Sequence, residues 1–210
     1  MYYFVKTPFF FKWFFRGCVW NLQNEDKSIY LSFDDGPHPE VTSLVLDILK
    51  EYNAKATFFC IGKNVAAYPS VYQRIINEGH AVGNHTYNHL NGWKTEDEDY
   101  LNDVYEAQKY IDSNLFRPPY GRISNFKIKL LSKLKYRMKI IMWTVLSGDF
   151  DPQISKETCC DNVILNTKAG SIVVFHDSEK AKEKMLYALP LVLSHFKSKD
   201  FNFKKIKIES

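Results

Sequence analysis

Two adjacent carboxylates, Asp34 and Asp35, follow a short apolar run of the sequence. This run, residues 28–33, is rich in β-branched and aromatic side chains and predicts a buried strand. Gly36 and Pro37 end it, because proline offers no N–H to a strand ladder. Neighbouring strand side chains point to opposite faces, so one acid could act as a ligand and the other as a base. A solvated acidic loop before a turn is an equally good interpretation of these residues alone.

A histidine pair, His85 and His89, follows residues 80–83, which also predict a strand. Residues four apart lie on one face of a helical turn, so both imidazoles could bind one metal ion. With Asp35 they would supply two nitrogens and one oxygen and leave a position open for water, as in catalytic zinc sites. Zinc suits this donor set best, and cobalt, nickel or iron would also bind to it. Chance pairs on surface helices are common, so the pair gains weight only from its place after a strand.

Arg117 stands before two prolines and Tyr120, directly after another short predicted strand. The prolines stiffen this turn and could hold the guanidinium and the Tyr120 N–H in fixed directions. Two adjacent carboxylates need a cation nearby, which Arg117 could supply. A rigid N–H is what an oxyanion requires. A structural turn with a surface ion pair is the alternative.

Two more predicted strands end in residues that could serve the same site. Asp149 could pair with Arg117 or orient a histidine, while Trp143 and Phe150 suit either a core or a platform for substrate. His176 follows an almost wholly apolar strand and is either a core residue or an acid at the rim. Reactive side chains thus end five predicted strands, which favours one shared site over independent accidents.

Predicted strands and helices alternate along the chain, which favours an α/β fold with a parallel sheet covered by helices. About seven strands in this length indicate a barrel shorter than the eightfold one of ~250 residues. An open doubly wound sheet is the alternative. The strands are expected at 28–33, 56–61, 80–83, 115–117, 139–145, 171–175 and 202–206.

Two sequence signals predict where helices begin and break. Thr95 with Glu98 indicates a capping box at the start of a helix that runs to about residue 112. Pro190 predicts a break or restart within the last long helical region, because its ring excludes a backbone hydrogen bond.

The composition bounds the class of protein. With 210 residues the chain is long enough for one domain with a sizeable core. Its net charge of +4 is too mild to argue for nucleic acid, and we expect a monomer. Four cysteines without a CxxC spacing support neither a zinc knuckle nor a redox motif.

The first residues are aromatic and basic, and we expect residues 1–27 to pack on a domain formed by residues 28–210. No apolar run in residues 1–20 approaches the ~20 residues of a membrane span, and no cleavable signal is evident. A segment of this kind could instead lie on a membrane surface. The expected location is therefore cytoplasmic or membrane-associated.

Taken together, these motifs resemble those of the polysaccharide deacetylase family, the carbohydrate esterases of NodB-homology type. The five matching stretches, in order and with ordinary spacing, are FDDGP at 33–37, HTYNH at 85–89, RPPYG at 117–121, GDF at 148–150 and VVFH at 173–176. The resemblance covers about residues 28 to 207. It implies a distorted, incomplete (β/α) barrel and metal-dependent removal of acetyl groups from N-acetylated sugars.

The resemblance also implies a role for each matching residue. Asp35, His85 and His89 would be the ligands of one divalent metal, Asp34 the general base and His176 the general acid. Arg117 would hold Asp34, Tyr120 would offer its N–H to the oxyanion, and Asp149 would tune the others. Tyr120, Trp143, Phe150 and Val174 would contact the substrate.

Some positions depart from the pattern of the family. Leu146 and Phe150 stand where the fourth motif usually has an aspartate and a tryptophan, and Val174 replaces a leucine. Phe150 keeps an apolar wall for an acetyl methyl but lacks an indole N–H. These changes bear on substrate preference, whereas every metal and acid–base position is filled.

The leading hypothesis is therefore N-deacetylation of a polysaccharide or oligosaccharide, such as peptidoglycan or a chitin-like glycan, by metal-activated water. A metal-dependent amidase for a small non-sugar amide is one alternative. A carbohydrate-binding protein that has lost catalysis is another.

Overall fold

The computed structural model describes residues 3–22, 26–133 and 137–208 of the chain. Within these residues nine strands form one sheet, and neighbouring strands are parallel. The strands are β1 (Cys18–Val19), β2 (Ser28–Asp34), β3 (Ala56–Cys60), β4 (Ala81–Asn84), β5 (Leu115–Phe116), β6 (Lys139–Ile141), β7 (Val145–Leu146), β8 (Ile172–His176) and β9 (Asn202–Phe203).

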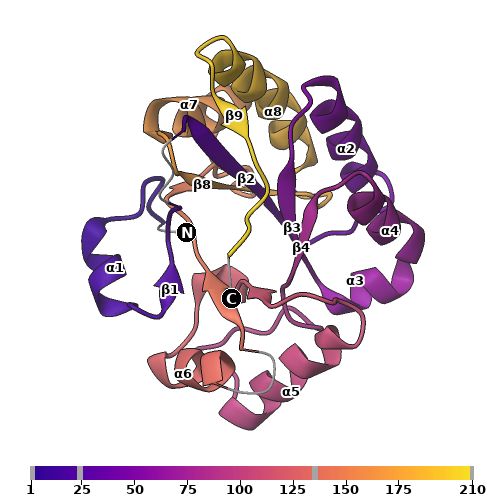
Figure 1. Cartoon of the computed structure of the whole chain (residues 1–210), viewed down its shortest axis with the longest axis vertical. Coiled ribbons are helices and arrows are strands. Elements are labelled where there is room, and N and C mark those ends of the chain that lie inside the picture. Colours follow the sequence, from indigo (N-terminus) through magenta and orange to yellow (C-terminus); the bar gives the residue numbers. More distant parts are fainter. Residues whose placement is uncertain (1–2, 23–25, 134–136, 209–210) are drawn as a thin grey trace.

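Helices α2 to α8 surround this sheet, while α1 lies apart on one side beside β1 (Figure 1). The helices of the described residues are α1 (Phe9–Phe14), α2 (Val41–Glu51), α3 (Gly62–Ala67), α4 (Pro69–Asn77), α5 (Asp97–Gln108), α6 (Asn125–Lys133), α7 (Lys156–Asn166) and α8 (Lys182–Lys197). A short 3₁₀ turn, η1 (Pro119–Gly121), follows β5.

The strand order distinguishes between the two architectures that the sequence allows. Strands β2 to β6 pair in chain order, and β8 pairs with the other edge of β2. Residues 139–146 bend from β6, which pairs with β5, into β7, which pairs with β8. The strands therefore follow one another around a ring that stays open between β6 and β7, whereas a doubly wound sheet reverses its strand order at a switch point. The predicted incomplete (β/α) barrel is confirmed.

Alternation along β2 fixes which side chains reach the inside of the barrel. Leu31 and Phe33 belong to the core beneath the helices, where the Phe33 ring stacks 5.1 Å from Phe58. Ser32 and Asp34 therefore point to the opposite side. Asp34 is the last residue of β2 and pairs in register with His176, the last residue of β8. The reactive residues thus meet because the strands end together.

Several expected elements differ in detail. The stretch 139–145 forms two strands rather than one, because the chain bends between the partners β5 and β8. Thr95 does not make a capping box: its hydroxyl donates to the Asn91 carbonyl, and Glu96 is the N-cap of α5. Helix α8 runs unbroken through Pro190, because buried side chains on both sides of the proline pack on the core.

Residues 3–22 lie along the bent stretch 139–146. Strand β1 pairs with β6, the Leu146 N–H donates to the Val5 carbonyl over 2.8 Å, and the Thr7 N–H donates to the Thr144 carbonyl over 3.0 Å. The segment therefore satisfies backbone groups on both halves of the bend, where the barrel would otherwise be open. The division of the chain at residue 27 stays a prediction. In the described part of the chain, no helix combines the length and apolar character needed to cross a bilayer.

Candidate active site

Three side chains converge at the carboxyl ends of β2 and β4 as a candidate metal centre. The Asp35 Oδ1 lies 3.2 Å from the His89 Nε2 and 3.7 Å from the His85 Nε2. One ligand atom from each residue lies within 4.8 Å of the other two. These are the three residues that the sequence predicts as ligands.

The histidines are not on a helical turn, and that expectation was wrong. Residues 85–89 form a loop after β4, in which Thr86 and His89 have φ of 63° and 60°. Such left-handed dihedrals are costly for non-glycine residues and need surrounding support. Asp103 on α5 supplies it, because its carboxylate accepts hydrogen bonds from the Tyr87 N–H, the Asn88 N–H and the Asn88 side chain. The sequence analysis missed Asp103, which shows only as one more acid on a helix.

The donor set fits a divalent metal on its own chemistry. The His85 Nδ1 lies 2.7 Å from the Arg117 carbonyl, which can only accept a hydrogen bond, so Nδ1 carries the proton and the lone pair is on the Nε2 that faces Asp35. Burial lowers the pKa of His85 to about 4, which keeps the imidazole neutral and able to bind a cation. Burial alone would raise the pKa of Asp35, but the hydrogen bond of His89 and the nearby histidines lower it. Two imidazole nitrogens and one carboxylate are a usual zinc donor set.

Asp34 does not face the same partners as Asp35. Its Oδ1 accepts a hydrogen bond of 2.6 Å from the Arg117 Nη1, and its side chain is 5% exposed. Arg117 is wholly buried and also donates to the Ser32 hydroxyl and to the carbonyls of Ile141 and Met142. Since its donors are used by the barrel, the guanidinium holds the Asp34 carboxylate in one position.

Tyr120 lies in η1 with φ of 61°, and its side chain is exposed. Its hydroxyl is 3.1 Å from the His89 Nδ1, and the two rings meet edge to face at 4.6 Å. This contact to a candidate ligand was not expected from the sequence. Gly121 follows because a Cβ there would lie 2.5 Å from the Trp143 ring.

Asp149 orients His176, which was one of its two expected partners. The Asp149 Oδ1 is 2.7 Å from the His176 Nδ1, and the Oδ2 accepts from the His176 backbone N–H. Burial would lower the pKa of His176, but Asp149, Asp35 and Asp34 outweigh it and raise the pKa to about 10. The imidazole is therefore held as a proton donor near neutral pH. The alternative partner of Asp149, Arg117, is bonded to Asp34 instead.

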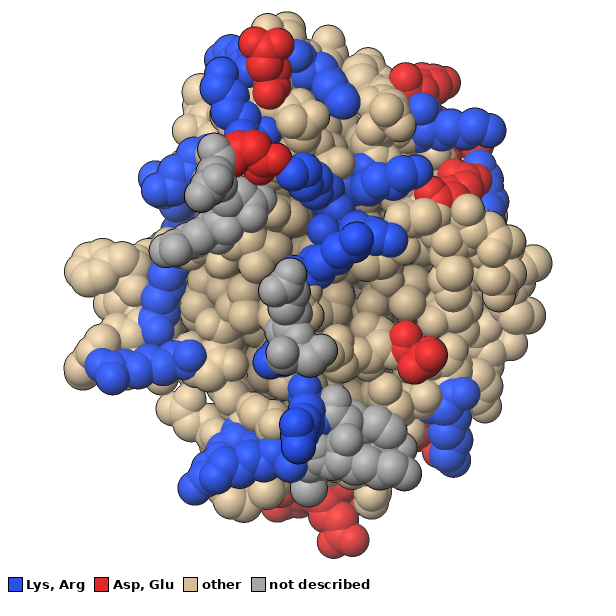
Figure 2. Space-filling view, in the orientation of Figure 1, with Lys and Arg blue, Asp and Glu red and all other residues tan. Residues whose placement is uncertain are grey.

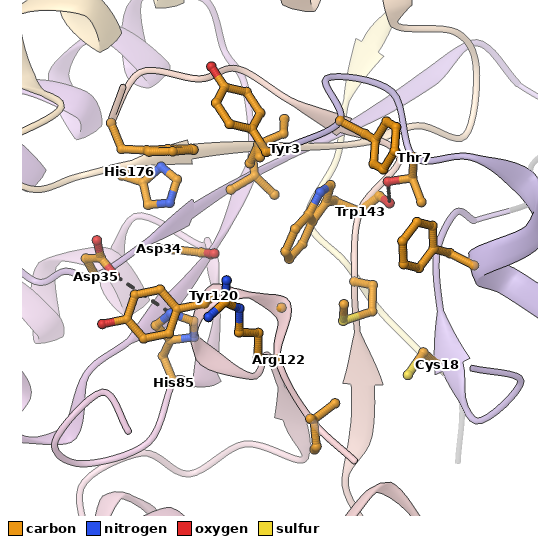
Figure 3. Close-up of a pocket in the computed structure, with 18 of the residues that line it drawn as sticks. Tyr3, Thr7, Cys18, Asp34, Asp35, His85, Tyr120, Arg122, Trp143 and His176 are labelled. Atoms are coloured by element: carbon orange, nitrogen blue, oxygen red, sulfur yellow. Dashed lines mark hydrogen bonds and ion pairs between the residues drawn. The ribbon is translucent and has the colours of Figure 1, made fainter. Parts of the chain in front are cut away.

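A cavity of about 450 Å³ connects these groups with the N-terminal segment. Figure 3 shows Asp34, Asp35, His85 and His176 at one end of it and Thr7 and Cys18 at the other, with Trp143 between them. All four predicted substrate contacts line this cavity, namely Tyr120, Trp143, Phe150 and Val174. The cavity is larger than an acetyl group requires and leaves room for a sugar ring.

Asp177 is a second buried acid that the sequence analysis did not single out. Its carboxylate accepts hydrogen bonds from the Gly36 N–H over 3.0 Å and from the Thr42 hydroxyl over 2.5 Å. A Cβ at residue 36 would lie 2.1 Å from this carboxylate, so only glycine fits the turn that follows Asp35. The only sequence signal for Asp177 is its position next to His176.

Comparisons with known proteins agree with this geometry. The family profile for polysaccharide deacetylase matches residues 21–139. A peptidoglycan-N-acetylglucosamine deacetylase of Bacillus cereus is 35% identical over 88% of this chain and 89% of its own length. A chitooligosaccharide deacetylase of Azorhizobium caulinodans is 37% identical over 77% of this chain and 79% of its own.

Solved structures give the same result. The crystal structure of a peptidoglycan N-acetylglucosamine deacetylase bound to a naphthyl N-hydroxybenzamide superposes with a TM-score of 0.86, at 31% identity and over 95% of both chains. The fold and these matches define an enzyme of the N-deacetylase class. The chain belongs to the polysaccharide deacetylase family.

Proposed function

We propose that this chain hydrolyses the acetamido group of N-acetylated sugars within a polysaccharide or oligosaccharide, such as peptidoglycan or a chitin-like glycan. One observation carries the proposal: Asp34 and His176 flank the candidate ligands Asp35, His85 and His89 in a single cavity. The relatives named for peptidoglycan and chitooligosaccharide support the substrate class. Water adds to the amide carbonyl, the C–N bond breaks, and acetate and a free amine leave.

Asp35, His85 and His89 would hold one divalent ion, and we propose zinc because the donor set is two imidazoles and a carboxylate. When bound, such an ion supplies a Lewis acid and lowers the pKa of a water molecule from about 15.7 towards about 7. The Arg117 carbonyl and the Tyr120 hydroxyl keep the two imidazoles oriented through their Nδ1 atoms.

Asp34 would accept the proton of the attacking water. Arg117 fixes one carboxylate oxygen, so the carboxylate does not need to reorganise during the reaction. A general base in this position contributes on the order of 10² to 10⁴ in rate. The Tyr120 N–H would donate to the oxyanion of the tetrahedral intermediate, because η1 holds that backbone at the cavity.

His176 would give a proton to the departing nitrogen. An amine leaves only when it is protonated. The Asp149 carboxylate, which contacts the His176 Nδ1, favours the protonated form of that imidazole. The other ring nitrogen is then the donor to the substrate. No step requires a serine or cysteine nucleophile, since water attacks the carbonyl directly.

The cavity also bears on the two alternatives. Its volume of about 450 Å³ exceeds what a small amide would fill, which favours a sugar over a small non-sugar substrate. A protein that only binds carbohydrate would have no need of a carboxylate and an imidazole that flank the candidate ligands and are each held in place, Asp34 by Arg117 and His176 by Asp149.

The test is mass spectrometry of acetylated chitooligosaccharides and muropeptides after incubation with zinc-loaded protein. We expect loss of acetyl groups and release of acetate, and at least a hundredfold less of both products with Asp34→Asn. Deacetylation of small amides but of no glycan would favour the amidase. Glycan binding without any turnover would favour the lapsed enzyme.

A further inference from the structure

Helix α1 exposes an aromatic surface to solvent. Phe9, Trp13 and Phe14 are 84%, 61% and 58% exposed, and Phe10 is 44% exposed. We call these four side chains the aromatic face. Phe9 and Trp13 are four residues apart, as are Phe10 and Phe14, so two adjacent stripes of the helix are aromatic. Contiguous exposed aromatic surface of this kind marks an interaction site.

The opposite side of α1 anchors it to the protein. Phe11 and the adjacent Phe15 pack against a buried cluster that includes Trp20 and Ile128. The Phe11 ring also contacts the Phe4 and Phe10 rings, at 6.1 and 5.0 Å. The aromatic face is thus held outward by packing of the other side, and its exposure does not result from a detached helix.

Positive charge surrounds the aromatic face. Lys6 precedes α1 in the chain and Arg16 follows it, and both are exposed; the Arg16 guanidinium lies 5.6 Å from the Trp13 ring. Residues 1–24 of the sequence contain no aspartate or glutamate. Lys12, on α1 itself, is half-buried, and its ammonium donates to the Asn21 Oδ1 over 2.7 Å. In Figure 2 the left edge of the molecule shows tan side chains with Lys or Arg among them.

We propose that the aromatic face docks on an anionic lipid bilayer. Phenylalanine and tryptophan rings bury their surface at the boundary between head groups and acyl chains, while lysine and arginine pair with anionic head groups. The combination of the aromatic face with Lys6, Lys12 and Arg16 matches both requirements.

A second copy of this chain is a poorer occupant. In a two-fold interface the same patch meets itself, so Lys6, Lys12 and Arg16 would face their own counterparts. Like charges opposed in this way disfavour association. A six-residue helix is also a small part of the roughly 800 Å² that each partner of a stable complex buries.

Docking would also define the class of substrate, and this step rests on the proposed deacetylation. Phe11 and Phe15, on the inner side of α1, line the same cavity as Asp34 and His176. The end of the cavity beneath α1 would then lie next to the bilayer. The glycan best placed to enter is one attached to a lipid.

The binding test uses the whole zinc-loaded protein and needs no substrate. Sedimentation with phosphatidylcholine vesicles that contain phosphatidylglycerol should carry the protein down, and vesicles of phosphatidylcholine alone should carry down much less. The double variant Phe9→Ser/Trp13→Ser should bind at least tenfold more weakly. Ile76→Ser is the matched control, because Ile76 is 40% exposed on α4, on the opposite side of the molecule from α1 (Figure 1).

The charge test replaces basic residues without touching the rings. Lys6→Gln and Arg16→Gln should each weaken binding to the anionic vesicles about fivefold, and added salt should do the same. Lys50→Gln and Lys63→Gln, exposed elsewhere, should change nothing. Equal binding to both kinds of vesicle, or equal loss in the control variants, would overturn the proposal. So would self-association that disappears in Phe9→Ser/Trp13→Ser, because the face would then be a contact between copies.

Activity separates this proposal from the proposed function. Phe9→Ser/Trp13→Ser should deacetylate a soluble N-acetylated oligosaccharide like the wild type but act more slowly on an N-acetylated glycolipid in anionic vesicles. If the wild type deacetylates neither substrate, the function fails while the vesicle binding still stands. If the variant deacetylates the glycolipid in vesicles as fast as the wild type does, the inference of a lipid-attached substrate is wrong.

Discussion

At the scale of single residues, the two neighbouring acids are separated by their partners. Asp34 faces the buried guanidinium of Arg117, whereas Asp35 faces two imidazoles. Strand alternation begins this separation, and the positive φ of 81° at Asp35 completes it by turning the chain out of the strand. Two chemically identical side chains can therefore perform different tasks.

Replacing the proposed base tests its task directly. We expect Asp34→Asn to lower kcat by about 10² to 10⁴, because the amide cannot take a proton from water. Zinc content, measured on the same preparation by elemental mass spectrometry, should stay at the wild-type level. Wild-type turnover by this variant would remove Asp34 from the role of base.

Replacing a candidate ligand should remove zinc as well as activity. His89→Ala removes one of three donors, so we expect the variant to lose zinc on dialysis and to lose activity with it. His195→Ala, on helix α8 and outside the ligand group, is the matched control and should retain both. Full zinc occupancy in His89→Ala would contradict the assignment.

The pair of Asp149 and His176 predicts a shift in pH dependence. The pKa of His176 is raised to about 10, so its protonated form is present below that pH and is lost above it. Asp149→Asn removes the carboxylate that raises this pKa, and the alkaline limb of kcat/KM should move to lower pH. The rate measured across pH, with the exposed Asp161→Asn as control, checks this. An unchanged limb would mean that another group is titrating.

At the scale of elements, the end of β8 also holds the turn after β2. Asp177 joins the two elements through the Gly36 N–H and the Thr42 hydroxyl. This arrangement places a carboxyl group where water does not reach, since Asp177 is 1% exposed. Burial raises the pKa of Asp177 from 3.8 to about 7.

The raised pKa of Asp177 affects stability with a definite sign. Between about pH 4 and about pH 7 the folded protein keeps a proton that the unfolded chain releases, so the contribution of this group to stability falls as pH rises. We expect wild type to lose up to about 1.4 kcal/mol per pH unit relative to Asp177→Asn over this range. Urea unfolding of the zinc-free proteins at several pH values measures the free energy of unfolding of each protein. A difference between the two proteins that does not change with pH would refute the shift.

At the scale of the whole molecule, the barrel and the N-terminal segment form one cavity. Residues at the ends of β2 and β8, in the loop after β4 and in η1 supply the reactive groups, and residues 3–22 supply the opposite wall. Because the candidate ligands come from β2 and from the loop after β4, an ion bound to them joins two elements that are far apart in sequence. Metal binding should therefore stabilise the entire fold.

Thermal unfolding with and without zinc tests this link. An ion at about 100 times its dissociation constant stabilises the folded state by about 2.7 kcal/mol. For a chain of this size that corresponds to a rise in Tm of roughly 5 to 10 °C. A chelator should reverse the rise, and His89→Ala should show none. An equal rise in His89→Ala would place the stabilising ion elsewhere.

The sequence by itself determined the class of fold and nearly all of the candidate site. Apolar strands that alternate with amphipathic helices require a covered parallel sheet, and reactive residues after strands must then gather at one edge. Asp34, Asp35, His85, His89, Arg117 and His176 were all found in this way, because strand alternation and strand ends are local properties.

Only the tertiary structure decided which groups pair. Asp149 had two candidate partners, and the distance across the barrel assigns it to His176 rather than Arg117. The loop at 85–89 is not helical because Asp103, from a different element, binds its backbone. The pairing of residues 3–22 with the bend between β6 and β7 depends on contacts between segments more than a hundred residues apart. Such contacts leave no periodic trace in the chain, which is why the sequence alone could not supply them.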